Sequence, residues 1–295
     1  MISRLVIIGV GLIGGSLALG LKAQGRVTTV VGVGRHEENL KLAKSLGIVD
    51  IWTTNMVEAV QDADVVVLAV PMGAYGSVFA EVAPHLKAGA IVTDAGSTKQ
   101  HALNEAAKHL PENVFFVAAH PIAGTEQSGA SAAFAELYMN HLCIVTPNAN
   151  TNETALGVVK DMWQSVGSEV IEMPAEEHDV LLASVSHLPH VAAFSLVNAV
   201  EKQKNDFYDP FAFAAGGFRD FTRIASSSPA MWRDVALSNK SALIEQIDGL
   251  QHELSAMKEA LVEEDGALLL DMFASAKQAR DEWLESKVQK LGEKS

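Results

Sequence analysis

The stretch RLVIIGVGLIG, residues 4–14, decides the fold. An apolar run leads directly into a G-x-G-x-x-G pattern, and a helical pattern follows. In a strand–turn–helix the first glycine permits a tight turn, the second lets backbone approach a pyrophosphate, and the third lets helix and strand pack closely. The helix N-terminus offers free N–H groups and a positive dipole end to the phosphates. We therefore predict a dinucleotide site, rather than a turn without a ligand, built by Gly9, Gly11, Leu12, Ile13 and Gly14.

The uncharged run Leu5–Leu21 has the composition of a signal peptide or membrane anchor as well. Glycines interrupt it, however, and each costs a helix interior about 1 kcal/mol. Only Arg4 supplies a positively charged leader, and no small-residue cleavage site stands out. A strand–turn–helix explains this run better.

The first part of the chain alternates short β-branched runs with helical patterns, which predicts an α/β fold with a parallel, doubly wound sheet of Rossmann type. The expected strands are Arg4–Ile8, Thr28–Val33, Val65–Ala69, Ala90–Thr93, Val114–Ala118, Leu142–Val145 and Glu169–Glu172. The expected helices include Asn39–Leu46, Lys99–His109 and Glu153–Ser165.

After Pro174 the strands stop, and apolar residues recur at helical spacing to the end of the chain. We predict two domains, a Rossmann domain over 1–174 and an all-helical domain over 175–295. Pro189 should bend the central helix of the second domain. The apolar stripes are too extensive for one helical layer to bury, so we expect a homodimer through this domain.

The composition of the chain limits its partners. Among 295 residues, 36 acidic and 22 basic side chains give a formal net charge of −14. Such a surface repels phosphate backbones and anionic lipids, so we expect neither a nucleic-acid nor a membrane partner. The single cysteine, Cys143, lies in an apolar run, which favours a buried thiol and fits a cytoplasmic protein.

Cofactor choice is commonly determined at the end of the second strand, where a carboxylate favours NAD. This chain has Gly34 and Arg35 there, and no carboxylate before Glu37. Arg35 could bind a 2′-phosphate, so NADP is favoured, although a glycine also admits NAD and Arg35 could be a solvated loop charge. We expect Val70 and Pro71, at the end of another strand, to line the cofactor site.

Strand ends also place candidate chemistry. His120 follows the run Val114–Ala119, and a neutral imidazole there could accept a proton from a substrate hydroxyl as hydride leaves. Ser97 and Thr125 are hydroxyl candidates beside it. The alternative is a histidine that makes only a structural hydrogen bond.

In the helical part, Ser186 and His190 share one helix face by their four-residue spacing. Arg219 and Arg223 do the same, and Asp220 is spaced to pair with Arg223. An anionic substrate of so acidic a chain needs local cations, and an arginine binds a carboxylate through two hydrogen bonds. By spacing alone, these residues could equally form surface salt links.

Together these segments resemble the prephenate/arogenate dehydrogenase family of tyrosine biosynthesis. The matching segments are GVGLIGG (residues 9–15), DAGSTK (94–99), HPIAGTEQSG (120–129), SHLPH (186–190), GGFRDFTRI (216–224) and MWR (231–233). The resemblance implies oxidative decarboxylation of prephenate, arogenate or both to an aromatic product, with NAD(P) as hydride acceptor and a helical dimerisation domain.

The resemblance also implies roles for individual residues. His120 would be the catalytic histidine that holds the ring C4 hydroxyl, and Ser97 would lie between that histidine and the nicotinamide. Arg223 would bind the substrate carboxylate. Further residues of the same pocket would be Thr125, Glu126, Ser186, His190 and Trp232. We assign no metal site.

Two other functions stay open at this point. A β-hydroxyacid dehydrogenase shares this domain plan, but it uses a lysine and an asparagine one helical turn later. Lys240 is the nearest lysine, and Ile244 stands where the asparagine should be. The other alternative is a nucleotide-sensing module without catalysis. His120 and Ser97, which we expect near the cofactor, argue against it.

Overall fold

The computed structural model describes residues 1–125 and 127–292 and divides into two compact units, Met1–Leu243 and Ile244–Ser295. The strands found among the described residues all belong to the first unit. The second unit contains most of one long helix and the whole of another.

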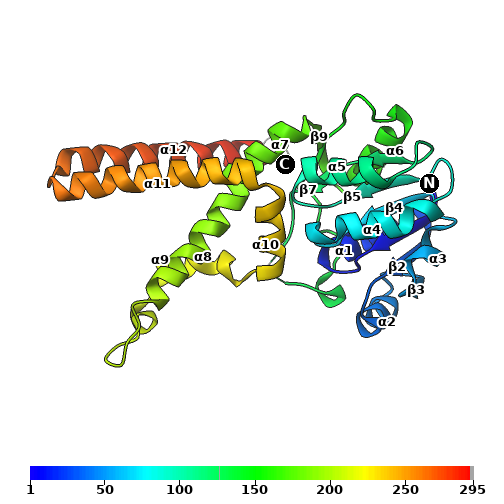
Figure 1. Cartoon of the computed structure of the whole chain (residues 1–295), viewed down its shortest axis with the longest axis horizontal. Helices are drawn as coiled ribbons and strands as arrows, with labels where there is room; N and C mark the ends of the chain where they lie inside the picture. Colours follow the sequence, from blue (N-terminus) through cyan, green and yellow to red (C-terminus); the bar gives the residue numbers. More distant parts are fainter. Residues whose placement is uncertain (126, 293–295) are drawn as a thin grey trace. The chain divides into compact units, whose positions relative to one another are not determined.

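A parallel sheet of six strands, in the order β3-β2-β1-β4-β5-β6, forms the centre of the first unit. The strands are β1 (Ile2–Ile8), β2 (Val27–Val33), β3 (Ile51–Thr53), β4 (Val65–Leu68), β5 (Ile91–Asp94) and β6 (Phe115–Val117). The helices between and beside them are α1 (Leu12–Ala23), α2 (Glu37–Ser45), α3 (Met56–Val60), α4 (Tyr75–Val82), α5 (Lys99–His109) and α6 (Glu153–Ser165) (Figure 1). This strand order is that of a doubly wound Rossmann sheet, which confirms the predicted fold class.

Helices cover both faces of this sheet, because side chains of a strand point alternately to opposite sides. Leu5 and Ile7 of β1 pack into one apolar core with residues of α1 and α6. Val6 and Ile8 pack into a second core with residues of α4 and α5. Strands buried on both faces explain the uninterrupted apolar runs in the sequence.

A second sheet, β7 (Ala119–Pro121), β8 (Leu142–Val145) and β9 (Glu169–Glu172), corrects the prediction that all strands join one parallel sheet. β7 runs antiparallel to β8, and β8 runs parallel to β9. His120 therefore lies inside β7 and not directly after a strand of the main sheet. Where the chain leaves the main sheet, the Asp94 carboxylate, rather than a strand carbonyl, accepts the N–H of Ala119 at 3.0 Å.

The helical part of the first unit comprises α7 (Ala175–Leu182), a π-helical turn (Ala183–His187), α8 (Leu188–Glu201), α9 (Gly216–Thr222) and α10 (Pro229–Ser238). The π-helical turn leads without a break into α8, so Pro189 lies inside a continuous helix, Ala175–Glu201, where it cannot donate a backbone hydrogen bond. The irregularity expected at Pro189 takes the form of the π-helical turn directly before it.

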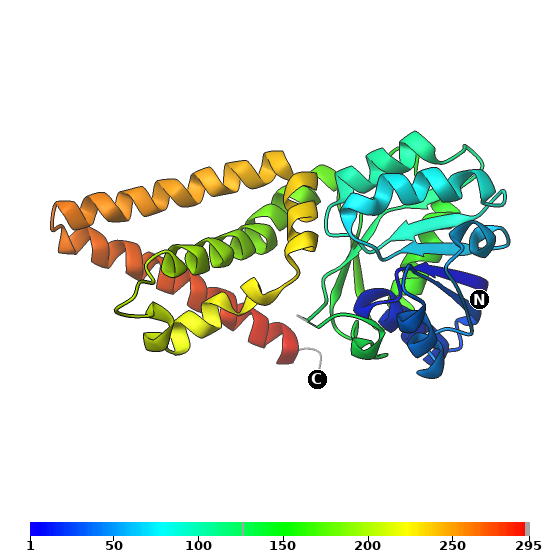
Figure 2. The ribbon, with the colours of Figure 1, turned by 60° about the horizontal axis from the view of Figure 1, so that its bottom comes forward.

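The second unit contains α11 (Lys240–Val262) from Ile244 onward and α12 (Gly266–Gly292), which a tight turn joins (Figure 2). In the turn, the N–H of Asp265 donates to the carbonyl of Ala260 at 2.9 Å. The Asp265 carboxylate then caps α12 by accepting the N–H of Leu268 at 2.9 Å. Glu264 adopts a left-handed conformation, with φ of 52°, to make the reversal.

Candidate active site

The glycine loop between β1 and α1 has the geometry of a dinucleotide cradle. Gly9 has φ of +100°, and a Cβ there would lie 2.3 Å from the carbonyl oxygen of Ala69. A Cβ on Gly14 would lie 2.5 Å from the carbonyl oxygen of Gly9. At Gly9 and Gly14 the backbone of the protein itself therefore leaves no room for a side chain. At Gly11 a Cβ would meet nothing within 4 Å, so the space beside it is open to a ligand.

The other residues of the predicted cofactor site lie around this loop. Gly11 is the N-cap of α1, and because a glycine has no side chain to accept from them, the first N–H groups of the helix are left for a pyrophosphate. Leu12 is buried and Ile13 half-buried in the first turn. Val70 is half-buried, and its Cγ1 would lie 3.1 Å from a Cβ on Gly9. Arg35 and Pro71 are exposed. The residues present therefore fit a dinucleotide.

A buried carboxylate organises the ends of β5 and β7. Asp94 accepts hydrogen bonds from the Tyr75 hydroxyl at 2.8 Å, from the Gly96 N–H at 3.0 Å and from the Lys99 ammonium at 2.5 Å. Both side chains of the Asp94–Lys99 ion pair are fully buried. Lys99 also donates to the carbonyl of Ala119 at 2.5 Å, so the ion pair fixes both backbone polar groups of the residue before His120.

Ser97 lies in the short loop between β5 and α5 and is half-buried. Hydrogen bonds fix the residues directly before and after Ser97. The N–H of Gly96 bonds to Asp94, and the Thr98 hydroxyl donates to the Ser238 hydroxyl of α10 at 3.0 Å. The loop that carries Ser97 is thus fixed by residues on either side of it.

His120 is buried in β7, with 9% of its surface exposed. Its Nδ1 lies 2.8 Å from Nε2 of His178 on α7, and Nδ1 of His178 lies 2.8 Å from the carboxylate of Asp179. Burial, followed by the charges of His178, Lys99 and His187, lowers the pKa of His120 well below 6.5. At neutral pH the His120 ring is therefore uncharged and able to accept a proton.

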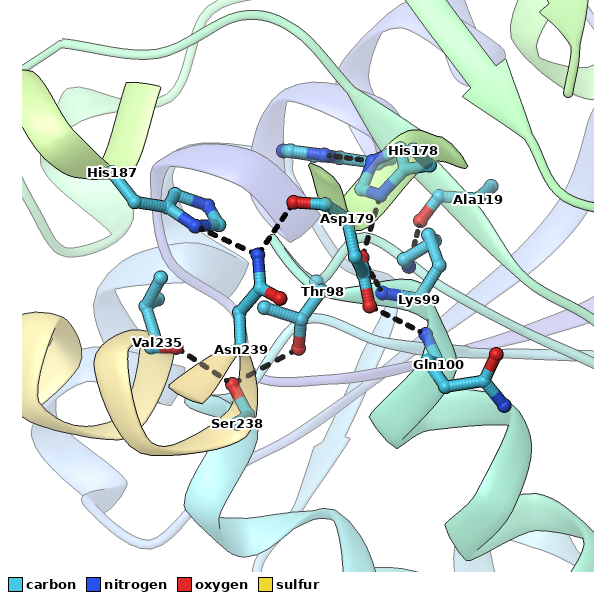
Figure 3. A network of polar contacts seen from close by, with 12 residues as sticks. Thr98, Lys99, Gln100, Ala119, His178, Asp179, His187, Val235, Ser238 and Asn239 are labelled. Carbon is cyan, nitrogen blue, oxygen red and sulfur yellow. Dashed lines mark hydrogen bonds and ion pairs between the residues drawn. The ribbon is translucent and has the colours of Figure 1, made fainter. Parts of the chain in front are cut away.

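Asp179 joins α7 to α5 (Figure 3). Its carboxylate accepts the backbone N–H groups of Lys99 at 2.7 Å and Gln100 at 3.0 Å, at the start of α5. The carbonyl of Asp179 accepts a hydrogen bond from the side chain of Asn239 at 2.7 Å, which also lies 3.2 Å from Nδ1 of His187. We call Asp94, Lys99, His120, His178 and Asp179 the buried polar centre.

A second group of predicted residues gathers beside it. The ring of His190 stacks on that of Trp232, with centroids 3.6 Å apart, and Nδ1 of His190 bonds to the carbonyl of Ser186 at 2.9 Å. Burial is the main cause that lowers the pKa of His190, and the charge of Arg223 lowers it further. The hydrogen bond between His190 and the Ser186 carbonyl raises this pKa, but by less. Ser186, His190, Arg223 and Trp232, which we call the rim, therefore lie close together.

His187 lies next to both groups. Its ring meets that of Trp232 edge to face at 6.0 Å, and its charge contributes to the lowered pKa of His120. Among the described residues, Nε2 of His187 and Nε1 of Trp232 are buried and have no hydrogen-bond partner. Buried N–H groups of this kind fit an oxygen atom of a bound ligand.

The remaining predicted residues are more peripheral or undescribed. Thr125 is exposed in the loop after β7, and its hydroxyl accepts the N–H of Gln127 at 3.2 Å. Glu126 lies outside the described residues. Asp220, which was expected to pair with Arg223, forms an exposed ion pair with Arg219 at 3.1 Å.

Several residues of the buried polar centre were not predicted as site residues. His178 follows His120 by 58 residues, and neither His178 nor the adjacent Asp179 belongs to a recognisable motif. Helical spacing does contain a signal, because Ala175, His178 and Leu182 share one face, and all of them are buried. A histidine on an apolar helix face could have marked the site.

A Rossmann-type glycine loop, with a neutral buried histidine in the same unit, defines a nicotinamide-dependent dehydrogenase. Residues 17–172 match the family model "Prephenate dehydrogenase, nucleotide-binding domain", and residues 174–275 match "Prephenate dehydrogenase, dimerization domain". The chain belongs to the prephenate dehydrogenase family.

Individual relatives agree with this assignment. The chain is 38% identical over 278 residues to the cyclohexadienyl dehydrogenase of Zymomonas mobilis, covering 94% of each protein. It superimposes with a TM-score of 0.90, at 36% identity, on prephenate dehydrogenase from Aquifex aeolicus in complex with hydroxyphenyl propionate and NAD+, covering 96% of this chain and 98% of that one. It also superimposes on the Synechocystis arogenate dehydrogenase, with a TM-score of 0.78, 26% identity and coverage of 95% and 99%.

Proposed function

We propose that this protein catalyses the oxidative decarboxylation of prephenate, arogenate or both, with hydride transfer to a nicotinamide cofactor. The observation that carries the proposal is His120, a buried histidine whose pKa is lowered well below 6.5, in the same unit as the glycine loop. The family relationship supplies the substrate class, because the relatives are named for prephenate, arogenate and cyclohexadienyl substrates.

The proposed chemistry uses a base and leaves the chain with no net change. His120 accepts the proton of the C4 hydroxyl while the hydride leaves C4, and the bound nicotinamide supplies the hydride acceptor. The bond from C1 to its carboxylate then breaks, carbon dioxide leaves, and the electron pair makes the ring aromatic. The product oxygen takes the proton back from His120. Aromatisation drives the reaction, so the protein mainly has to orient the groups.

We assign binding roles to the residues around this base. Ser97 would contact the hydroxyl and the nicotinamide, and Arg223 would hold a substrate carboxylate through two hydrogen bonds. Ser186, His190 and Trp232 would line the pocket with Thr125 and Glu126. The cofactor would lie on Gly9, Gly11, Leu12, Ile13 and Gly14, between Arg35 on one side and Val70 and Pro71 on the other.

Turnover assays with prephenate and arogenate, each with NAD and with NADP, test this function. Formation of reduced cofactor together with 4-hydroxyphenylpyruvate or tyrosine is the expected result. If none of the four combinations gives turnover, the proposal is wrong. Oxidation of a β-hydroxyacid in place of these substrates would favour the alternative dehydrogenase.

We also propose that NADP is used at least as well as NAD. Arg35 is exposed two residues beyond β2, where it is free to reach a 2′-phosphate, and no carboxylate precedes Glu37 there. Arg35→Ala should weaken NADP binding by about 1.5–3 kcal/mol, the value of a hydrogen bond to a charged group, and leave NAD binding nearly unchanged. Equal effects on both cofactors would show that Arg35 makes no contact with the phosphate.

We further propose that the protein is a homodimer through its helical domain, which begins after Pro174. The matched dimerization domain supports it, as do exposed apolar side chains such as Val185, Phe213 and Phe273. The stretch Ala175–Glu201 is long and apolar enough to cross a membrane, but its buried His178 and Asp179 bond to β7 and α5. We assign its apolar surface to the dimer of a cytoplasmic enzyme. Sedimentation showing an active monomer at micromolar concentration would refute this.

A further inference from the structure

The order of three buried groups determines which nitrogen of His120 carries a proton. Asp179, His178 and His120 form a chain of hydrogen bonds, with 2.8 Å from the Asp179 carboxylate to Nδ1 of His178 and 2.8 Å from Nε2 of His178 to Nδ1 of His120. Each contact needs one proton, and only one arrangement supplies it if the carboxylate is ionised and both rings are neutral.

Asp179 is ionised at neutral pH. Burial opposes its charge, but hydrogen bonds from His178 and from the N–H groups of Lys99 and Gln100 outweigh burial and lower its pKa. An ionised carboxylate only accepts, so Nδ1 of His178 carries a proton. Burial is the largest cause of the lowered pKa of His178, so the ring is neutral and its Nε2 has no proton.

The next contact follows from the first. Because Nε2 of His178 has no proton, Nδ1 of His120 must donate to it. His120 is also neutral, so its Nε2 is left with a lone pair. This is the form that can accept a proton from a hydroxyl group. The opposite tautomer would present an N–H there and could not act as a base.

We propose that His178 and Asp179 are positioning residues that hold His120 as the tautomer with a proton on Nδ1 and a bare Nε2. This role rests on the proposed function only in taking His120 as the base of the reaction. The residues of this hydrogen-bond chain come from two elements, with His120 on β7 and His178 and Asp179 on α7. A third element, α5, fixes Asp179 through the N–H groups of Lys99 and Gln100. The same arrangement stabilises the His120 ring when it takes up a proton, because the Asp179 charge lies one imidazole away.

His178→Ala is the sharpest variant, because it removes the acceptor of the Nδ1 proton of His120 and leaves both tautomers open to that ring. We expect kcat to fall about 10²–10⁴-fold, the usual contribution of a general base, while the substrate KM changes little, and added imidazole should restore part of kcat. Asp179→Asn should lower kcat less, because its amide oxygen can stay toward His178 and Lys99 while the NH2 group takes the place of the oxygen that faces Gln100. His85→Ala, in an exposed turn, is the matched control and should keep wild-type kcat and gain nothing from imidazole.

The tautomer itself is measurable without turnover. Nitrogen-15 NMR of histidine-labelled protein, with His120 assigned by its loss in His120→Asn, should show a protonated Nδ1 and an unprotonated Nε2 in the wild type. In His178→Ala the form protonated on Nε2 should appear. A wild-type His120 protonated on Nε2 overturns the proposal, and so does a folded His178→Ala with wild-type kcat. If the wild type shows the expected tautomer but turns over none of the four substrate and cofactor pairs, the proposed function fails and the positioning role stands.

Discussion

The buried polar centre and the rim meet their hydrogen-bonding needs in opposite ways. In the centre, Asp94 and Asp179 are satisfied by donors of the chain itself, and Lys99 is fully buried with two acceptors. Beside and within the rim, Nε2 of His187 and Nε1 of Trp232 are buried and have no hydrogen-bond partner among the described residues. The chain therefore sets the geometry of the centre in advance, and the two unpartnered nitrogens fit the proposal that a ligand completes the rim.

The largest effect should come from the base in the centre. His120→Asn should lower kcat about 10²–10⁴-fold, because no group then accepts the hydroxyl proton. Cofactor affinity should stay unchanged, since the glycine loop is not touched. Steady-state kinetics and calorimetric titration of the cofactor measure the two quantities, and near-normal kcat would remove His120 from the proposed mechanism.

The next effect concerns the stability of the centre. Lys99→Met should lower the free energy of unfolding by about 3–5 kcal/mol, because it leaves the Asp94 charge buried without its counter-ion. Lys22→Met is the matched control. Its ion pair with Asp50 has a similar length of 2.7 Å but is solvent-exposed, so the loss should be below about 1 kcal/mol. Similar losses in urea unfolding of both variants would contradict this view of the centre.

In the rim, a substitution should alter binding rather than folding. Arg223→Lys should raise the substrate KM about 10- to 100-fold, because lysine cannot reproduce the two parallel hydrogen bonds of a guanidinium. Cofactor KM and the free energy of unfolding should change little. Asp220→Asn, beside it on the helix and paired with Arg219, should leave the substrate KM unchanged. An unchanged KM in Arg223→Lys would exclude Arg223 from the substrate site.

The smallest effect is a pH dependence that separates folding from turnover. Burial, mainly, lowers the pKa of His120 well below 6.5 and that of His187 to about 4, whereas both regain ordinary values near 6.5 on unfolding. Between these values the unfolded chain binds more protons, so the free energy of unfolding should fall as the pH falls from about 6.5 to about 4. Turnover should stay level above about pH 6.5, since His120 is already neutral there. Urea unfolding and kcat measured across this range check both statements, and a constant unfolding free energy would contradict the first.

Sequence reasoning found the fold because the deciding signals are local. The glycine motif and β-branched runs each act within a few residues, although the short strand β3 was not among the expected strands. The partner of a strand is not a local property. The runs Leu142–Val145 and Glu169–Glu172 have the composition of main-sheet strands, and only the structure shows that they form a separate sheet with β7.

The same limit applies to the site. Residues within a recognisable motif, such as His120 and Arg223, could be identified as candidates from the sequence. His178 and Asp179 match no motif. The apolar helix face around His178 is a signal of burial, but the partner of His178 depends on a contact between α7 and β7 across 58 residues. In the sequence, Lys99 is only the last residue of the segment DAGSTK. Its burial against Asp94 depends on how β5, α5 and β7 pack together.

The carboxylate of Asp179 has a consequence for how the protein should fail on heating. One of its oxygen atoms accepts the N–H of Lys99 and holds the His178 ring behind His120, and the other accepts the N–H of Gln100 in the first turn of α5. Fraying of that turn and misalignment of the base are thus a single event. As the temperature rises, catalytic competence and the protection of the Lys99 and Gln100 amides from hydrogen exchange should disappear together, with no inactive intermediate in which this helix end is still intact.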